Sequence, residues 1–143
     1  MKTALEAAGG QVKLIAPHLG FINATKGKLK VDQSFLTAAS VVYDAVYVPA
    51  GEKSFSLLQT EPDAIHFIEE AYKHCKPIAA EGEGIDLVFL SAIGGKIDVT
   101  PQSHKVNTDN GVLFNRPAKD FIKAISQHRF WQRENAGKVG VPA

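Results

Sequence analysis

The sequence predicts one α/β domain, a parallel β-sheet covered by helices on both faces, and three observations lead to this fold class. Helix-like and strand-like stretches alternate along 143 residues, a length that suits a single core. The central strand-like stretches are almost wholly apolar, which is typical of strands buried on both faces. Glycine-containing turns follow two of these stretches, and open parallel sheets bind ligands at such carboxyl ends.

The first half of the chain is predicted to contain one helix, two strands and a hairpin. The helix ends at the glycine pair Gly9-Gly10. Polar and apolar residues alternate on both sides of Lys26-Gly27, which suggests a small excursion or a hairpin there. In chain order the elements are helix 2–8, strand 11–17, hairpin 20–31 and strand 45–48.

The second half is predicted to contain three helices and two strands. The clearest helix begins at Pro62, with Asp63 near its positive end and Cys75 in its apolar stripe. The apolar stretch that ends at Glu81 is a strand, and the helix after it stops at Gly94-Gly95. In chain order the elements are helix 62–76, strand 77–81, helix 84–93, a strand or hairpin 105–115 and helix 117–133.

The chain opens in a helix with no strand before it. In an open doubly wound sheet the first strand lies at the centre, so its absence would leave a gap between its neighbours. We therefore expect the first strand to be missing from this chain and the natural protein to continue upstream. Residues 1–133 are expected to form the domain, and residues 134–143 a tail that is loose or docks as an extended arm.

Composition argues against several classes of function. The net charge is +1, and the basic run 25–30 contains no aromatic residue, which argues against a nucleic-acid partner. No apolar run approaches the roughly 20 residues that span a bilayer, and no signal-peptide core is present, so we expect a soluble chain without a membrane partner. The single cysteine, Cys75, excludes an internal disulfide and CxxC metal sites.

The candidate functional residues lie after two predicted strands, at Gly51, Glu81, Gly82, Glu83 and Gly84. Adjacent strands would bring both turns to one crevice. The glycines allow a sharp strand-to-helix turn, which carries the nucleophile in many α/β enzymes, but this turn has no Ser, Cys or Thr. Two close carboxylates can act as acid and base. We favour the other interpretation, in which the carboxylates only complement the positive helix end.

Two further patterns are expected to be structural. Cys75 lies in the apolar stripe of its helix, and a thiol buried in such surroundings is inert. His66, Glu70 and His74 recur every four residues, a spacing that can hold zinc. No fourth ligand is indicated, so we expect a solvated helix face and no metal site.

The C-terminal aromatic pair Phe130 and Trp131 has two interpretations, and both stay open. Such a cluster can anchor an interface with a partner. It can equally fold back and close the core.

Three segments resemble the C-terminal domain of large-subunit haem catalases: "AAGGQVKLIAPHLG", "VDQSFLTAASVVYDAVYVPAG" and "DAIHFIEEAYKHCKPIAAEGEG". The resemblance covers residues 5–133. It implies a flavodoxin-like, three-layer fold of the DJ-1/PfpI and class I glutamine amidotransferase type. In that superfamily a reactive cysteine occupies the elbow, a position that falls at Gly82, and a supporting glutamate lies on the first strand. This chain has glycine in place of the cysteine, and it lacks the first strand that would carry the glutamate. The resemblance therefore implies that this chain holds no catalytic residue.

The resemblance also implies a function, namely that of a non-catalytic accessory domain that stabilises a haem catalase. Haem and hydrogen peroxide chemistry would belong to an upstream domain, so this chain is expected to bind no cofactor. Its partners would be the catalase core and the parent homotetramer, in the cytoplasm or secreted with the parent. A holdase-type chaperone acting on unfolding client proteins is compatible, because the stretch "YDAVYVPA" is apolar and a sheet edge would be open. The alternative is a DJ-1-like hydrolase or glyoxalase that uses the crevice carboxylates.

Overall fold

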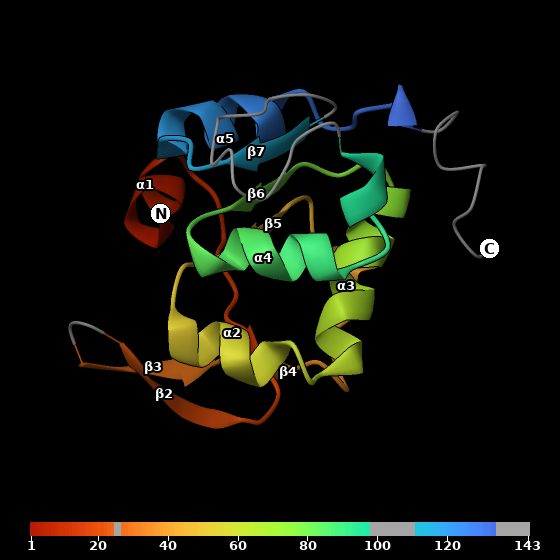
Figure 1. The fold of residues 1–143 in the computed structure, drawn as a ribbon. Coiled ribbons are helices and arrows are strands. Elements are labelled where there is room, and N and C mark those ends of the chain that lie inside the picture. Colours follow the sequence, from red (N-terminus) through yellow and green to blue (C-terminus); the bar gives the residue numbers. More distant parts are fainter. Residues whose placement is uncertain (25–26, 98–110, 134–143) are drawn as a thin grey trace.

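The computed structural model describes residues 1–24, 27–97 and 111–133, and Figure 1 shows how their elements are arranged. The helices and strands in chain order, with the 3-10 turns η1 and η2, are α1 (Lys2–Ala7), β1 (Ile15–Ala16), β2 (Gly20–Ala24), β3 (Gly27–Val31), β4 (Gln33–Ser34), η1 (Ser40–Val42), β5 (Val46–Val48), α2 (Glu52–Leu58), α3 (Pro62–Lys73), β6 (Ile78–Ala80), α4 (Glu83–Leu90), η2 (Gly94–Lys96), β7 (Val112–Phe114) and α5 (Ala118–Ser126).

The central sheet is parallel, in the order β5-β6-β7. Its register places Val46 beside Ile78 and Ile78 beside Val112. Successive side chains of a strand point to opposite faces, so Ile78 joins one hydrophobic cluster while Ala79 joins the other, together with Leu113. Because both faces are buried, the strands have the nearly continuous apolar character seen in the sequence.

Helices cover both faces of this sheet (Figure 1). Helices α2, α3 and α4 contribute Phe55, Ile68 and Ile85 to the cluster on one face. Helices α1 and α5 contribute Leu5 and Phe121 to the cluster on the other face, and the two helices touch each other. The predicted three-layer α/β architecture is therefore confirmed.

Strands β1 and β4 form a separate parallel pair, with Ile15 beside Gln33. In the part of the chain that the structure describes, β5 pairs only with β6 and is thus an edge strand. Among the described strands, β1-β4 and β5-β6-β7 are therefore separate parallel sheets.

Strands β2 and β3 form the predicted hairpin, in which Gly20 lies opposite Val31 and Ala24 opposite Gly27. The hairpin is a two-stranded sheet of its own and extends away from the body of the molecule beyond α2 (Figure 1). Among its described residues only Val31 is buried, at 3% exposure. The expected turn residue Lys26 lies outside the described residues.

Helix α3 ends at Lys73, earlier than the predicted residue 76, because a Schellman motif terminates it. The Lys76 N–H donates to the Ala71 carbonyl over 3.0 Å, and the Cys75 N–H donates to the Tyr72 carbonyl over 3.0 Å. Cys75 adopts a left-handed conformation, φ 60°. Glycine is the usual residue at this position, so the sequence did not indicate the stop.

The last helix is also shorter than predicted, because α5 ends at Ser126 and not at residue 133. The chain then turns through His128, φ 69°, and the Phe130 N–H donates to the Cys75 carbonyl over 2.7 Å. Part of the predicted strand 105–115 and the tail 134–143 fall outside the described residues. No helix in residues 1–24, 27–97 and 111–133 combines the length and apolar character needed to cross a membrane.

Candidate functional site

The turn between β6 and α4 has the backbone shape of a nucleophile elbow. Strand β6 ends at Ala80, Glu81 follows, and Gly82 with φ 50° and ψ −126° is the N-cap of α4. A residue with a side chain is strained at these backbone dihedral angles. The α/β hydrolases tolerate that strain because it exposes a nucleophile at the tip of the turn. Gly82 offers no nucleophilic atom, so the elbow has the geometry without the reagent.

Close packing against the end of β5 surrounds this elbow. A Cβ atom placed on Gly82 would lie 2.8 Å from the Cβ of Ala50. A Cβ atom on Gly84 would lie 2.5 Å from the Val48 carbonyl oxygen and 2.7 Å from that of Pro49. Real Cβ atoms essentially never make contacts this short, so the first turn of α4 rests directly on the backbone at the end of β5. Both positions therefore require glycine for space.

The Glu83 carboxylate fills the position that faces the backbone donors of this edge. Its Oε2 atom accepts a hydrogen bond of 2.8 Å from the N–H of Gly51, the N-cap of α2 with φ 142°. The backbone N–H of Glu83 itself and that of Gly51 lower the pKa of the carboxyl group. Backbone donors at such an edge stabilise anions, and here the protein's own side chain supplies the anion.

The Glu81 carboxylate has a different partner. The Tyr47 hydroxyl donates to Glu81 Oε2 over 2.9 Å. Burial is the main cause that raises the pKa of Tyr47, and the bond to Glu81 adds to it. Tyr47 belongs to the cluster on the α1/α5 face, whereas Gly51 begins α2 on the opposite face. The two glutamates thus bind groups on different sides of the sheet and not a shared proton.

A third strand also contributes to the site. Asn115 follows β7 with φ 52°, and its N–H donates to the Ala80 carbonyl over 3.0 Å. Its Oδ1 atom accepts a hydrogen bond of 3.1 Å from the N–H of Gly82. The carboxyl ends of β5, β6 and β7 therefore meet at the predicted edge, and side chains of the protein accept the hydrogen bonds of the elbow.

The structure brings together all five predicted site residues at this edge, and it adds three that were not among the predicted site residues. These are Ala50, Tyr47 and Asn115. Ala50 and Asn115 lie where strands end, which is a signal that the sequence contained. Tyr47 gave no such signal, because its contact with Glu81 depends on the register between β5 and β6.

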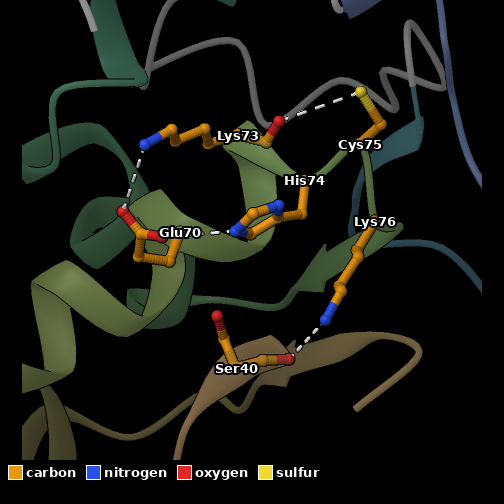
Figure 2. Close-up of polar contacts among 6 residues, drawn as sticks. All are labelled: Ser40, Glu70, Lys73, His74, Cys75 and Lys76. Atoms are coloured by element: carbon orange, nitrogen blue, oxygen red, sulfur yellow. Dashed lines mark hydrogen bonds and ion pairs between the residues drawn. The ribbon is translucent and has the colours of Figure 1, made fainter. Parts of the chain in front are cut away.

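Figure 2 shows Cys75 and its neighbours at the other end of β6, just after α3. The thiol is 3% exposed, which confirms its burial, and its sulfur lies 3.9 Å from the Lys73 carbonyl oxygen. Its predicted place on the helix stripe was wrong. Nearby, Lys76 Nζ donates to the Ser40 carbonyl, and burial, followed by the charge of Arg129, lowers the pKa of Lys76. The inertness of the thiol stays a prediction.

The candidate zinc ligands lie on the outer face of α3. His74 Nε2 is 3.4 Å from Glu70 Oε2, and Lys73 Nζ is 4.0 Å from Glu70 Oε1 (Figure 2). His66 and His74 are exposed. Within the described residues no three metal-binding side chains come together.

The C-terminal aromatic pair divides between the two roles left open above. Phe130 packs against the α1/α5 cluster, and its ring occupies the space that a Cβ on Gly111 would need. Trp131 is 64% exposed. The buried Arg133 donates from Nη1 to the Lys76 carbonyl over 2.6 Å, and its guanidinium lies 5.6 Å from the centre of the Phe130 ring. Phe130 therefore helps to close the core, and an interface role for Trp131 stays a prediction.

Comparison with known proteins identifies similar sequences over nearly the whole chain. A family model described as the C-terminal domain found in long catalases matches residues 1–135. Catalase HPII of Mycobacterium avium is 42% identical over 137 residues, which cover 90% of this chain and 19% of that protein. Catalase-2 of Bacillus subtilis (strain 168) is 37% identical over 131 residues, which cover 91% of this chain and 18% of that protein. The chain spans about a fifth of the length of these relatives.

Solved structures with the same fold include proteins of the DJ-1/ThiJ/PfpI group. A ThiJ/PfpI domain protein from Brachyspira murdochii superposes with a TM-score of 0.70 at 19% identity, over 88% of this chain and 83% of that one. Oxidised DJ-1 of Toxoplasma gondii gives a TM-score of 0.63 at 16% identity, over 95% and 83% of the two chains. At these identities the similarity shows the fold alone, which is the flavodoxin-like fold expected from the sequence.

Proposed function

The chain belongs to the family of C-terminal domains found in long catalases, and from that premise we propose that it is a non-catalytic accessory domain that stabilises a haem catalase. Decomposition of hydrogen peroxide, and the haem that performs it, would belong to the preceding part of the parent polypeptide. The partner of this domain would be the catalase core within the parent homotetramer.

The observation that carries this proposal is the state of the elbow. Gly82 supplies no nucleophile, and Ala50 occupies the space that a side chain there would need. The Glu83 and Glu81 carboxylates are hydrogen-bonded to Gly51 and Tyr47, on opposite faces of the sheet. This geometry speaks against the alternative of a hydrolase or glyoxalase that uses the two carboxylates, because neither is directed at a common reacting atom.

The experiment compares full-length parent catalase with a variant from which this C-terminal domain, residues 1–143 in the present numbering, has been deleted. We expect similar peroxide turnover at 25 °C but a shorter half-life of activity on heating without the domain, because activity loss on heating follows the unfolding rate. Equal half-lives would contradict a stabilising role. A domain fragment that by itself turns over esters, amides or 2-oxoaldehydes, and loses that activity in the Glu81→Ala, Glu83→Ala double variant, would contradict the non-catalytic assignment.

We propose a holdase-type chaperone activity as a second function, favoured by exposed apolar side chains. Leu36, Val41 and Val42 are 83%, 62% and 71% exposed. Exposed apolar patches mark protein–protein contact surfaces, and an unfolding client presents apolar surface of its own. Light scattering of a heat-stressed client protein tests this function. Suppression of scattering at equimolar chain is expected, and unchanged aggregation would exclude it.

A further inference from the structure

Exposed large apolar side chains concentrate in one part of the chain. Among the described residues ten such side chains are exposed, and seven of them lie between Leu19 and Val42. Leu19, Phe21, Ile22 and Leu29 belong to the β2–β3 hairpin or directly precede it. Grouped exposed apolar side chains mark contact surfaces, whereas single ones are ordinary. The hairpin is therefore a candidate contact surface.

The register divides the hairpin into two faces. On the inner face Ile22 lies opposite Leu29, next to the pair that contains Val31. Val31 is 3% exposed, and Ile22 and Leu29 are 37% and 39% exposed. The body of the domain thus covers this face in part.

The outer face has a different composition. Here Phe21 lies opposite Lys30, and Asn23 lies opposite Lys28. Phe21 is 69% exposed, and the other three side chains are exposed as well. One aromatic side chain with lysines beside it has the composition of an interface anchor and its polar rim.

The hairpin receives no support from a third described strand. Strands β2 and β3 hydrogen-bond to each other and to no other described strand. An isolated pair of strands is marginally stable in water, and stability needs a third strand or a packed face. The inner face rests in part on the domain, and the outer face keeps Phe21 69% exposed, so the outer face is the one that a partner would cover.

We propose that the outer face of the β2–β3 hairpin docks on the catalase body that accompanies this domain in long catalases. Phe21 would enter an apolar recess, and Lys28 and Lys30 would face carboxylates at its rim. This inference rests on the proposed accessory function and names the surface through which it acts. We take the catalase body as the occupant because, in the relatives, the matched region is only 18–19% of the polypeptide and the remainder is attached to it. Attachment raises its effective concentration far above that of a free partner.

The direct test is thiol labelling in the native full-length catalase that carries this domain. Phe21→Cys and Leu90→Cys form a matched pair, because Phe21 and Leu90 are 69% and 57% exposed and lie on different elements. Maleimide modification of each peptide is followed by mass spectrometry. We expect the thiol at position 21 to react at least about tenfold more slowly than the thiol at position 90, as a docked side chain should. Equal rates, or faster modification at position 21, overturn the proposal.

A second test measures the consequence for the parent enzyme. The variants are Phe21→Ser and the double variant Lys28→Glu, Lys30→Glu. Each should shorten the half-life of catalase activity on heating, toward the half-life of the catalase that lacks this domain. Leu90→Ser is the control and should leave the half-life unchanged. The Cys75 thiol is 3% exposed, so we expect the fold to protect it from maleimide, and its modification would report unfolding of the domain.

The outcomes separate the two proposals. If removal of the domain shortens the half-life but the hairpin variants match the control, the docking surface is wrong and the accessory function stands. If removal of the domain changes nothing, the accessory function is wrong, and the labelling rates alone then decide whether the hairpin is covered.

Discussion

Two regions of the domain differ in how much of their surface is already in contact with the rest of the protein. They are the elbow between β6 and α4 and the β2–β3 hairpin. At the elbow, the Gly82 N–H, the Gly51 N–H and both glutamate carboxylates have hydrogen-bond partners within the domain. On the outer face of the hairpin, Phe21 is 69% exposed beside lysines. The region that carries chemistry in many α/β enzymes is closed, and a region without chemistry is left open.

The difference indicates which part of the domain meets other molecules. A site that binds a ligand keeps donors and acceptors free for it, and an interface keeps apolar surface free. Within the described residues, the donors and acceptors of the elbow are largely used inside the domain, as they are not in a ligand site. The hairpin leaves apolar surface free, as an interface does. The following predictions test this contrast, from the largest expected effect to the smallest.

Gly84→Ala should have the largest effect on stability. The added Cβ would lie 2.5 Å from the Val48 carbonyl oxygen, so α4 must move away from β5. Such overpacking should lower the free energy of unfolding by about 3 kcal/mol. Gly95→Ala is the matched control, because a Cβ there meets nothing within 4 Å, and it should change stability by less than about 0.5 kcal/mol. Urea unfolding of both variants measures the difference, and equal midpoints would show that the elbow tolerates movement.

Gly82→Ala should have the next largest effect, through two causes that can be separated. The φ of 50° strains a residue with a Cβ, and that Cβ would lie 2.8 Å from the Cβ of Ala50. We expect a loss of about 2 kcal/mol. Adding Ala50→Gly removes the contact but not the strain, so the double variant should recover roughly 1 kcal/mol after the cost of Ala50→Gly alone is subtracted. Simple additivity in this cycle would mean that Ala50 does not close the elbow.

Glu83→Gln should have a smaller effect that depends on pH. The pKa of Glu83 is lower in the folded domain than its ordinary value of 4.5, because its own N–H and that of Gly51 stabilise the carboxylate. A depressed folded pKa contributes stability above the unfolded pKa, and this contribution disappears as pH falls through the folded pKa. The wild type should therefore exceed Glu83→Gln in melting temperature at neutral pH, and the gap should close below pH 4.5.

The control for this experiment is Glu52→Gln, which changes an exposed glutamate in the first turn of α2. Its melting temperature should follow that of the wild type more closely across the same pH range. A gap between wild type and Glu83→Gln that persists unchanged below pH 4.5 would mean that the stabilisation does not come from the ionised carboxylate of Glu83.

Phe21→Ser should have the smallest effect on the isolated chain. The side chain is 69% exposed, so its removal should change the free energy of unfolding by less than about 0.5 kcal/mol. Val31→Ala on the same hairpin, 3% exposed, should cost roughly 1–2 kcal/mol. Calorimetry on the two variants compares the faces of the hairpin. A large loss from Phe21→Ser would place that side chain in the domain's own core and end the contrast with the elbow.

Much of the fold could be predicted because its elements follow simple patterns. Apolar runs marked β5 and β6, Pro62 marked the start of α3, and alternation marked the hairpin. Helix α2 was missed because it has no buried residue and hence no strong apolar stripe. The end of α3 was placed too late because Cys75 adopts a conformation that normally belongs to glycine.

The site could be predicted in its position but not in its contacts. Gly82 and Gly84 stood out as a turn at the end of a strand, and the structure places them there. The separation of Glu81 from Glu83 could not be seen, because neighbours in sequence take partners that are 34 and 32 residues away. Those partners depend on the register of the sheet, which no local pattern specifies.

The contact between Arg133 and the end of α3 has a consequence for synthesis of the protein. The Lys76 carbonyl that receives the Arg133 guanidinium precedes it by 57 residues. At about 5–20 residues per second a ribosome needs roughly 3–11 s to make that stretch. During this interval the nascent α3 and β6 exist without the arginine that completes them. The order of translation thus sets the earliest moment at which this domain is able to reach its finished form.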